Sequence, residues 1–185
     1  MDSKPQKWQR LNRETLLDTK FMKVYEDTVR LPTGAVFDDY TVVTLPDGVI
    51  VVATDVDGKL ITQFEYKYAI NEVILNLPSG GVEDGESPLQ AAAKELLEET
   101  GYGSKHNDIE LIKTVYEYPS KLSHVLYIVR IKNAEKIQDV QHEPTESISG
   151  VHLISADMDD FGGVFDTTYN ITALALTLPE FLKVK

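Results

Sequence analysis

A run of consecutive apolar and β-branched residues, Val49 to Thr54, restricts the fold more than any other feature of the sequence. The run is short and lacks polar alternation, which predicts a strand buried on both faces. The turn sequences Leu45-Pro46-Asp47-Gly48 and Asp55-Val56-Asp57-Gly58 bound it. A chain of 185 residues is long enough to enclose such a strand in a core, and the absence of cysteine excludes disulfides and thiolate catalysis.

The order of the expected helices and strands indicates the fold class. Strand patterns occur at about 21–30, 36–44, 49–54, 59–66, 73–77, 109–116, 125–131 and 151–154. Helix patterns occur at residues 87–100 and at about 168–182. This order predicts an α+β fold with a mixed or antiparallel sheet covered by helices. An early hairpin at about residues 8–45 indicates an N-terminal β arm, so we expect two domains, residues 1–45 and 46–185.

The charge balance narrows the classes of partner. The formal net charge is −12, from 18 Lys and Arg against 30 Asp and Glu. Such a surface disfavours non-specific binding to nucleic acid or to anionic membranes, and a phosphorylated small substrate would need metal ions or clustered Lys and Arg. No apolar run is long enough to span a membrane, and residues 1–6 lack a signal core, so we expect a soluble, cytoplasmic protein.

The helix expected at residues 87–100 has an acidic face. Ser87 is a suitable N-cap, Gln90 completes a capping box, and Gly101 is a suitable C-terminal stop. On a helical wheel an acidic group lies opposite the apolar face, close enough to converge: Glu95, Glu98 and Glu99 against Leu89, Ala92, Ala93, Leu96 and Leu97. Two carboxylates about 5 Å apart repel by roughly 3 kcal/mol at an effective dielectric of about 20. A solvated surface explains most such faces; bound divalent cations are the functional alternative.

The segment from Gly80 to Tyr102 resembles the signature of the Nudix hydrolases. That signature is Gly, five residues, Glu, seven residues, then Arg-Glu-(apolar)-x-Glu-Glu-x-Gly-(apolar), and the matching residues are Gly80, Glu86, Glu95, Leu96, Glu98, Glu99 and Gly101. Lys94 stands where the family has arginine, which keeps the charge and loses the planar fork. The length and fixed spacing of this match favour the metal site over a solvated helix face.

Two further stretches resemble the ADP-ribose pyrophosphatase branch of that family. Glu65 to Tyr68 is similar to a Gln-Tyr-Arg stretch of the branch, and residues 76–80 are similar to its Glu-(apolar)-Pro-Ala-Gly stretch. Lys67 stands where the branch favours arginine, and Asn76 stands where it often has glutamate. Both differences fall on positions where the resemblance implies substrate contacts.

The resemblance implies a fold, a metal and a reaction. The fold would be a Nudix-type α/β/α sandwich with a mixed sheet and an N-terminal antiparallel β arm, which implies a homodimer. Mg²⁺ or Mn²⁺ would be held by oxygen ligands from Glu95, Glu98, Glu99 and the carbonyl of Ser79. The reaction would be hydrolysis of the pyrophosphate bond of a nucleoside diphosphate sugar, ADP-ribose giving AMP and ribose 5-phosphate, by attack of water on phosphorus.

By resemblance to the branch, the general base lies within the signature or on the loop before the last strand, which here contains residues 143–146. As general base we favour Glu146, with Glu143 second and Glu98 as the candidate within the signature. The expected substrate contacts are Lys67, Arg30 and the backbone of Gly80 and Gly81. Three aromatic residues could stack on a base, although core packing is the simpler expectation for them: Trp8, Phe21 and Tyr68.

Two other functions stay open at this point. Another Nudix specificity would use a nucleoside triphosphate, a dinucleoside polyphosphate or a capped RNA, and the negative charge disfavours long RNA. A catalytically silent Nudix domain would bind a nucleotide as a sensor. The complete set of signature glutamates favours an enzyme over a sensor.

We predict that Glu146→Gln lowers turnover and leaves the fold unchanged, because glutamine keeps the size of the side chain and cannot accept a proton. The measurement is kcat at saturating Mg²⁺, with circular dichroism to check the fold. A wild-type kcat in this variant would remove Glu146 from the mechanism.

Overall fold

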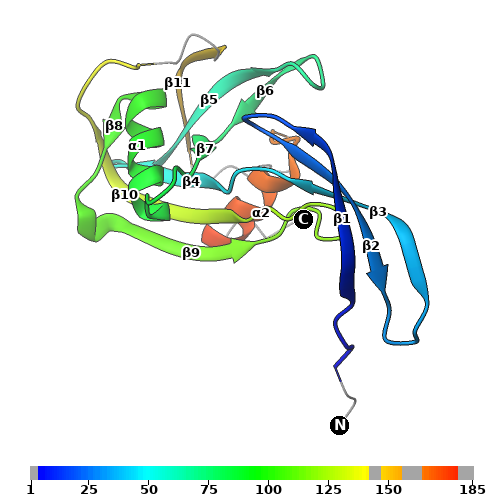
Figure 1. Cartoon of the computed structure of the whole chain (residues 1–185). Helices are drawn as coiled ribbons and strands as arrows, with labels where there is room; N and C mark the ends of the chain where they lie inside the picture. The colour runs from blue at the N-terminus through cyan, green and yellow to red at the C-terminus, as the bar shows by residue number, and fades with distance from the viewer. Residues whose placement is uncertain (1–3, 142–146, 156–163, 179–185) are drawn as a thin grey trace. The chain divides into compact units, whose positions relative to one another are not determined.

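The computed structural model describes residues 4–141, 147–155 and 164–178 (Figure 1). It contains two compact units, each described here by itself. Unit 1 comprises Met1–Pro46 and Tyr116–Val125, and unit 2 comprises Asp47–Val115 and Leu126–Lys185. The segment Tyr116–Val125 therefore groups with the N-terminal residues. The division into domains at residues 45 and 46 stays a prediction.

Unit 1 is built on a three-stranded antiparallel sheet in the order β1-β2-β3. Its strands are β1 (Gln9–Asp18), β2 (Lys23–Arg30) and β3 (Val36–Thr44). The Arg13 guanidinium of β1 donates to both carboxylate oxygens of the buried Asp27 on β2, at 2.6 and 2.7 Å. This two-bond ion pair holds the pKa of Asp27 below its ordinary value and fastens the first strand pair. The predicted antiparallel β arm is confirmed.

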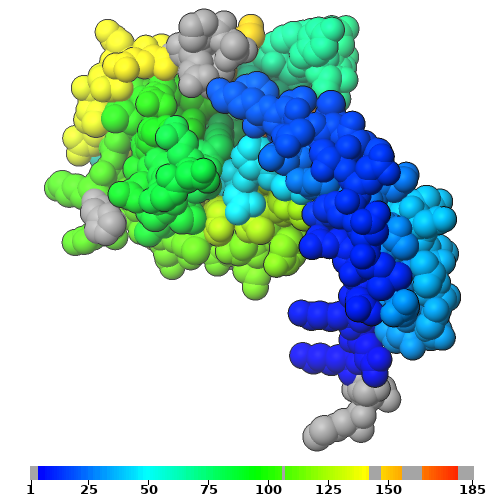
Figure 2. Space-filling view, viewed as in Figure 1, coloured from blue at the N-terminus to red at the C-terminus, as the bar shows by residue number. Residues whose placement is uncertain are grey.

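The expectation of core packing for three aromatic residues is wrong. Trp8 is 48%, Phe21 68% and Tyr68 86% exposed. Trp8 stacks on Phe37 with 6.3 Å between ring centroids. Figure 2 shows the atoms of the N-terminal strands in blue at the molecular surface. The described part of unit 1 contains no helix, so within this unit no helix packs on the sheet. Apolar side chains there stay exposed because the unit supplies no second layer.

Unit 2 contains an eight-stranded mixed sheet with the path β11-β5-β4-β10-β8; β6 pairs with β5, β7 with β4, and β9 with β10. The strands are β4 (Gly48–Asp55), β5 (Lys59–Lys67), β6 (Glu72–Asn76), β7 (Ser79–Gly81), β8 (Tyr102–Gly103), β9 (Ile109–Val115), β10 (Leu126–Lys136) and β11 (Ile148–Ser155). The β4–β10 pair is parallel and the others are antiparallel. The expected α+β fold with a mixed sheet is confirmed.

Strand β4 separates two hydrophobic cores. Val49, Val51 and Ala53 belong to the core that includes side chains of α1 (Pro88–Thr100). Ile50 and Val52 belong to the core that includes side chains of α2 (Thr168–Thr177). Since successive side chains of a strand point to opposite faces, the two helices cover opposite faces of β4. The prediction of a strand buried on both faces is confirmed.

Two boundaries differ from the sequence prediction. Helix α2 ends at Thr177, with Leu178 as its C-cap, and the rest of the predicted helix to residue 182 lies outside the described residues. Strand β10 continues to Lys136 through a register shift after Ile131, where Asn133 takes a φ of 53°.

Within residues 4–141, 147–155 and 164–178, no helix has the length and hydropathy required to cross a membrane.

Candidate active site

Strand β7 fixes the start of the signature segment (residues 80–102) to the buried strand β4. The register pairs Ser79 with Ile50 and Gly80 with Val49. Two backbone hydrogen bonds extend this ladder: Val51 donates to the Pro78 carbonyl at 2.9 Å, and Val82 donates to the Asp47 carbonyl at 2.9 Å. The backbone on both sides of Gly80 is therefore held by the core of unit 2.

Helix α1 begins and ends where the sequence predicted. The Gln90 amide N–H donates to the Ser87 hydroxyl, and the Ser87 amide N–H donates to the Gln90 side chain, which completes the capping box. Gly101 takes a φ of 71° and ends the helix, its N–H donating to the Leu97 carbonyl at 2.8 Å. The caps fix the register of the helix, so Glu95 and Glu99 lie one turn apart.

Glu99 is buried, which corrects the expectation that it lies opposite the apolar face. Its residue exposure is 3%, and its carboxylate accepts a hydrogen bond from the Ser79 N–H at 3.0 Å. Burial raises the pKa of Glu99 to about 9, and the charges of Glu95 and Glu65 act in the same direction. The Ser79 N–H and the nearby Gln63 amide lower the pKa and so oppose part of this shift. The amide of Gln63 is buried and forms no hydrogen bond with the described residues, so its effect on Glu99 is weaker than that of Ser79.

Glu95 lies directly over the backbone of Gly80. A Cβ atom added at Gly80 would stand 2.2 Å from Cδ of Glu95 and 2.4 and 2.5 Å from its carboxylate oxygens. Only a glycine therefore lets this carboxylate reach β7. Glu95 and Glu99 thus both meet the short strand β7, one at Gly80 and the other at Ser79.

The third signature glutamate is Glu98, on the same helix. Glu98 is partly exposed, and its carbonyl accepts a hydrogen bond from the Gln141 N–H at 2.7 Å. In the part of the chain that the structure describes, no three Asp, Glu or His side chains stand close enough to hold a metal ion. The chemistry of Glu95 and Glu99 nevertheless fits a hard divalent cation: both are oxygen ligands, and burying one carboxylate near another is costly unless positive charge balances it.

Lys94 connects the helix to the preceding loop. Its ammonium donates to the Glu83 carboxylate at 2.7 Å, and the hydrogen bond with Glu83 raises the pKa of Lys94, with further contributions from Glu86 and Glu95. The Glu83 N–H in turn donates to the Glu86 carboxylate at 3.2 Å. Lys94 therefore ties the helix to this loop at the place where the signature has arginine.

A polar row on β5 lies next to the glutamates, and the sequence prediction included only its outer end. Gln63, Glu65 and Lys67 alternate along β5 and so share one face. Glu65 accepts from the Lys67 ammonium at 2.5 Å and from the Asn76 amide at 2.7 Å. The signal that points to Glu65 in the sequence is this alternation of polar residues along an expected strand.

The remaining predicted residues are Arg30, Gly81, Glu143 and Glu146. Arg30 lies at the end of β2 in unit 1, where its guanidinium donates to the Gln9 side chain at 3.4 Å. Gly81 pairs with Gly48 and has open space where a Cβ would lie. Glu143 and Glu146 lie outside the described residues. The roles of these residues stay predictions.

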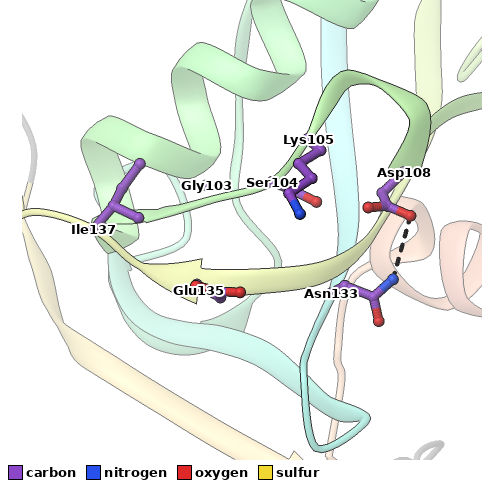
Figure 3. A pocket seen from close by; sticks show the side chains of 7 residues that line it. All are labelled: Gly103, Ser104, Lys105, Asp108, Asn133, Glu135 and Ile137. Atoms are coloured by element: carbon purple, nitrogen blue, oxygen red, sulfur yellow. Dashed lines mark hydrogen bonds between the residues drawn. The ribbon is translucent and has the colours of Figure 1, made fainter.

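A surface depression of about 460 Å³ lies elsewhere in unit 2, between β8, η1 (His106–Asp108) and β10 (Figure 3). On its wall the Asn133 amide donates to the Asp108 carboxylate at 3.2 Å. None of the predicted site residues lines this depression. It is therefore separate from the glutamates of α1.

The chain belongs to the Nudix family. The family description "NUDIX domain" matches residues 44–161, and "Nucleoside diphosphate sugar hydrolase N-terminal domain" matches residues 8–43. The first match contains β7, α1 and the three glutamates, which agrees with the resemblance of the signature segment. The predicted class of Nudix pyrophosphohydrolase is confirmed.

Three known proteins are similar to this chain over most of its length. The chain is 27% identical to the ADP-ribose pyrophosphatase of Bacillus subtilis (strain 168) over 145 residues, which cover 78% of each chain. It is 25% identical to the methanol dehydrogenase activator of Bacillus methanolicus over 181 residues, which cover 95% of each. The crystal structure of an ADP compounds hydrolase is similar with a TM-score of 0.78 and 26% identity, covering 98% of this chain and 97% of that one.

We predict that Gly80→Ala weakens metal binding and leaves the stability nearly unchanged. The new methyl group displaces the end of the Glu95 side chain, which can move without disturbing the backbone. The affinity for Mn²⁺ should fall by about 10- to 100-fold, the usual loss when a ligand is misplaced. Calorimetric titration with Mn²⁺ measures the affinity, and urea unfolding measures the stability.

Gly81→Ala is the matched control for this prediction, because a Cβ at Gly81 meets no atom within 4 Å. This variant should bind Mn²⁺ like the wild type. Equal affinities in both variants would show that the approach of Glu95 to Gly80 has no part in metal binding.

We predict that Glu99→Gln stabilises the protein in EDTA at alkaline pH. The pKa of Glu99 lies at about 9 in the folded chain against an ordinary 4.5, so the folded state disfavours the charged form. The cost is absent below pH 4.5, grows as the pH rises and is complete above about 9. At pH 8 the free energy of unfolding of the variant should exceed that of the wild type by about 1.4 kcal/mol or more, the energy that corresponds to a pKa shift of one unit.

Urea unfolding at pH 4 and pH 8 tests this dependence. Glu110→Gln is the control, because Glu110 is an exposed carboxylate of the same unit that pairs with Arg130. The same gain at both pH values for Glu99→Gln would show that its charge does not destabilise the folded chain.

Proposed function

We propose that the chain hydrolyses the pyrophosphate bond of a nucleoside diphosphate sugar with Mg²⁺ or Mn²⁺, and that ADP-ribose is the substrate, giving AMP and ribose 5-phosphate. The observation that carries this proposal is the meeting of Glu95 and Glu99 at β7, where two carboxylates are placed beside a closely approachable glycine backbone. The similarity to the ADP-ribose pyrophosphatase and to the ADP compounds hydrolase supports the substrate class.

Glu95, Glu98, Glu99 and the Ser79 carbonyl would hold the metal. A divalent cation at this place supplies charge neutralisation for the diphosphate and lowers the pKa of a water molecule. Gly80 and Gly81 leave the β7 backbone bare, so the diphosphate can approach it closely. The proposed contact from the Lys67 ammonium adds a positive charge on the side of β5.

The reaction needs one water and one proton acceptor. Water attacks one phosphorus atom, the bond from that phosphorus to the bridging oxygen breaks, and the other phosphate leaves with its sugar or nucleoside. Glu146 is the proposed acceptor of the water proton, with Glu143 second and Glu98 within the signature. No covalent bond to the protein is required, in keeping with a chain without cysteine.

A homodimer through the N-terminal sheet belongs to this proposal. Apolar side chains on β1 and β3 are exposed, among them Leu11, Leu16, Leu17 and Phe37. A second copy of the chain would cover such a surface. Sedimentation velocity of the full chain measures the oligomeric state, and a monomer at micromolar concentration would remove this part of the proposal.

A substrate panel tests the proposed function. We expect Mg²⁺-dependent release of AMP from ADP-ribose, faster than product release from a nucleoside triphosphate, a dinucleoside polyphosphate or a capped RNA, and none in EDTA. Glu98→Gln should lower kcat by more than about 100-fold, the scale set by loss of one group that stabilises transition-state charge. The control Glu110→Gln should keep the wild-type rate.

Other results of the panel identify the alternatives. Faster hydrolysis of another nucleotide would replace ADP-ribose as the substrate and keep the class of reaction. Tight binding of ADP-ribose without any product would indicate a sensor. Undiminished activity in EDTA would contradict the metal site.

A further inference from the structure

A buried asparagine on α2 is joined to the polar row on β5 by a chain of hydrogen bonds. Asn170 is completely buried, and its carboxamide faces the backbone at the end of β6. Its oxygen accepts from the Leu77 N–H at 3.2 Å, and its nitrogen donates to the Leu75 carbonyl at 3.4 Å. The side chain thus pairs with the backbone of two alternate residues, as a neighbouring strand would.

The same nitrogen of Asn170 also sets the orientation of Asn76. It donates to the Asn76 side-chain oxygen at 2.9 Å, and Asn76 is completely buried as well. With its oxygen occupied in this way, Asn76 presents its nitrogen to Glu65, to which it donates at 2.7 Å. Each hydrogen bond therefore fixes the direction of the next.

Glu65 ends the buried part of this chain. One carboxylate oxygen accepts from Asn76 and the other accepts from Lys67 at 2.5 Å. The side chain of Glu65 is 13% exposed and that of Lys67 is 35% exposed, so the chain runs from the core to the surface. Glu65 shares a face of β5 with Gln63, and the charge of Glu65 contributes to the raised pKa of Glu99.

We propose that Asn170 is a positioning residue for the hydrolysis: through Asn76 it holds the Glu65 carboxylate, and with it the Lys67 ammonium, in the orientation that receives the substrate diphosphate. We call Asn170, Asn76, Glu65 and Lys67 the amide relay. The inference rests on the proposed function, because it gives Lys67 a substrate to bind. It assigns to the C-terminal helix a part in substrate binding, in addition to its packing in the core.

Two isosteric variants break the amide relay at different links. Asn170→Asp keeps the acceptor for the Leu77 N–H and loses the donor to Asn76. Asn76→Asp keeps the acceptor for Asn170 and loses the donor to Glu65, so it leaves the attachment of α2 intact and remains informative if Asn170→Asp does not fold. Both should lower kcat/KM by about 10-fold or more, mainly through a raised KM.

The matched control is Thr177→Val on the same helix. Thr177 is buried, and its hydroxyl donates to the Ala173 carbonyl within α2 at 2.6 Å. This variant loses a buried hydrogen bond of the helix without touching the relay. Its stability should fall, while its KM should stay at the wild-type value.

A double-mutant cycle distinguishes positioning from general loss of structure. In a Glu65→Gln background, Asn170→Asp should lower kcat/KM by less than about twofold further, because the relay is already interrupted. The inference would be overturned if the losses of kcat/KM from Asn170→Asp and Glu65→Gln multiplied in the double variant. A wild-type KM in both relay variants would also overturn it. The assay uses whichever panel nucleotide the wild type hydrolyses. If the wild type hydrolyses none, the Kd of ADP-ribose replaces kcat/KM. An error in the proposed substrate is thereby distinguished from an error in the role of Asn170.

Discussion

Burial of β4 on both faces is the constraint on which the site of unit 2 depends. One set of its side chains packs with α1 and the alternate set packs with α2, while its backbone pairs with β7. Because β7 and α1 are both fixed to this one strand, the Ser79 N–H and the Glu99 carboxylate meet at 3.0 Å. The precision of this contact comes from the core, and no loop has to supply it.

The site combines this rigidity with an electrostatic cost. Glu99 is buried near two other carboxylates, Glu95 and Glu65, and burial raises its pKa to about 9. The Ser79 N–H offsets only part of that cost. A divalent cation would remove the remainder, and for this reason metal binding and stability are linked in such an arrangement. The polar row on β5 extends the charged surroundings from Glu99 to Lys67.

The sequence predicted those parts of the structure that local patterns determine. The buried strand and the capped helix follow from residues within a few positions of one another, so Val49–Thr54 and Ser87–Gly101 were identified correctly. Strand β7 has three residues, too few for any periodicity, and was missed. The inward position of Glu99 was also missed, because Ser79 and Gln63 become its neighbours only in the folded sheet.

Burial of aromatic residues was predicted wrongly for a different reason. Hydrophobicity shows that a side chain favours a core, but it does not show that a second layer exists. Trp8 is 48% exposed on a sheet to which the described part of its own unit adds no helix. The Asn170–Asn76 hydrogen bond was equally hidden, since 94 positions separate the two residues. Glu143, Glu146 and Arg30 remain assigned by resemblance alone.

The last glycine of the signature segment shows that such a motif records geometry as well as chemistry. A Cβ at Gly101 would stand 2.1 Å from the carbonyl oxygen of Gln138, a backbone atom that cannot turn aside. The Gly101 carbonyl also accepts hydrogen bonds from the N–H groups of Ile137 and Gln138. These bonds attach the end of the helix to the residues that directly follow β10. A side chain at this position would therefore collide with a second main chain, so the motif requires a glycine here for geometry and not for metal binding.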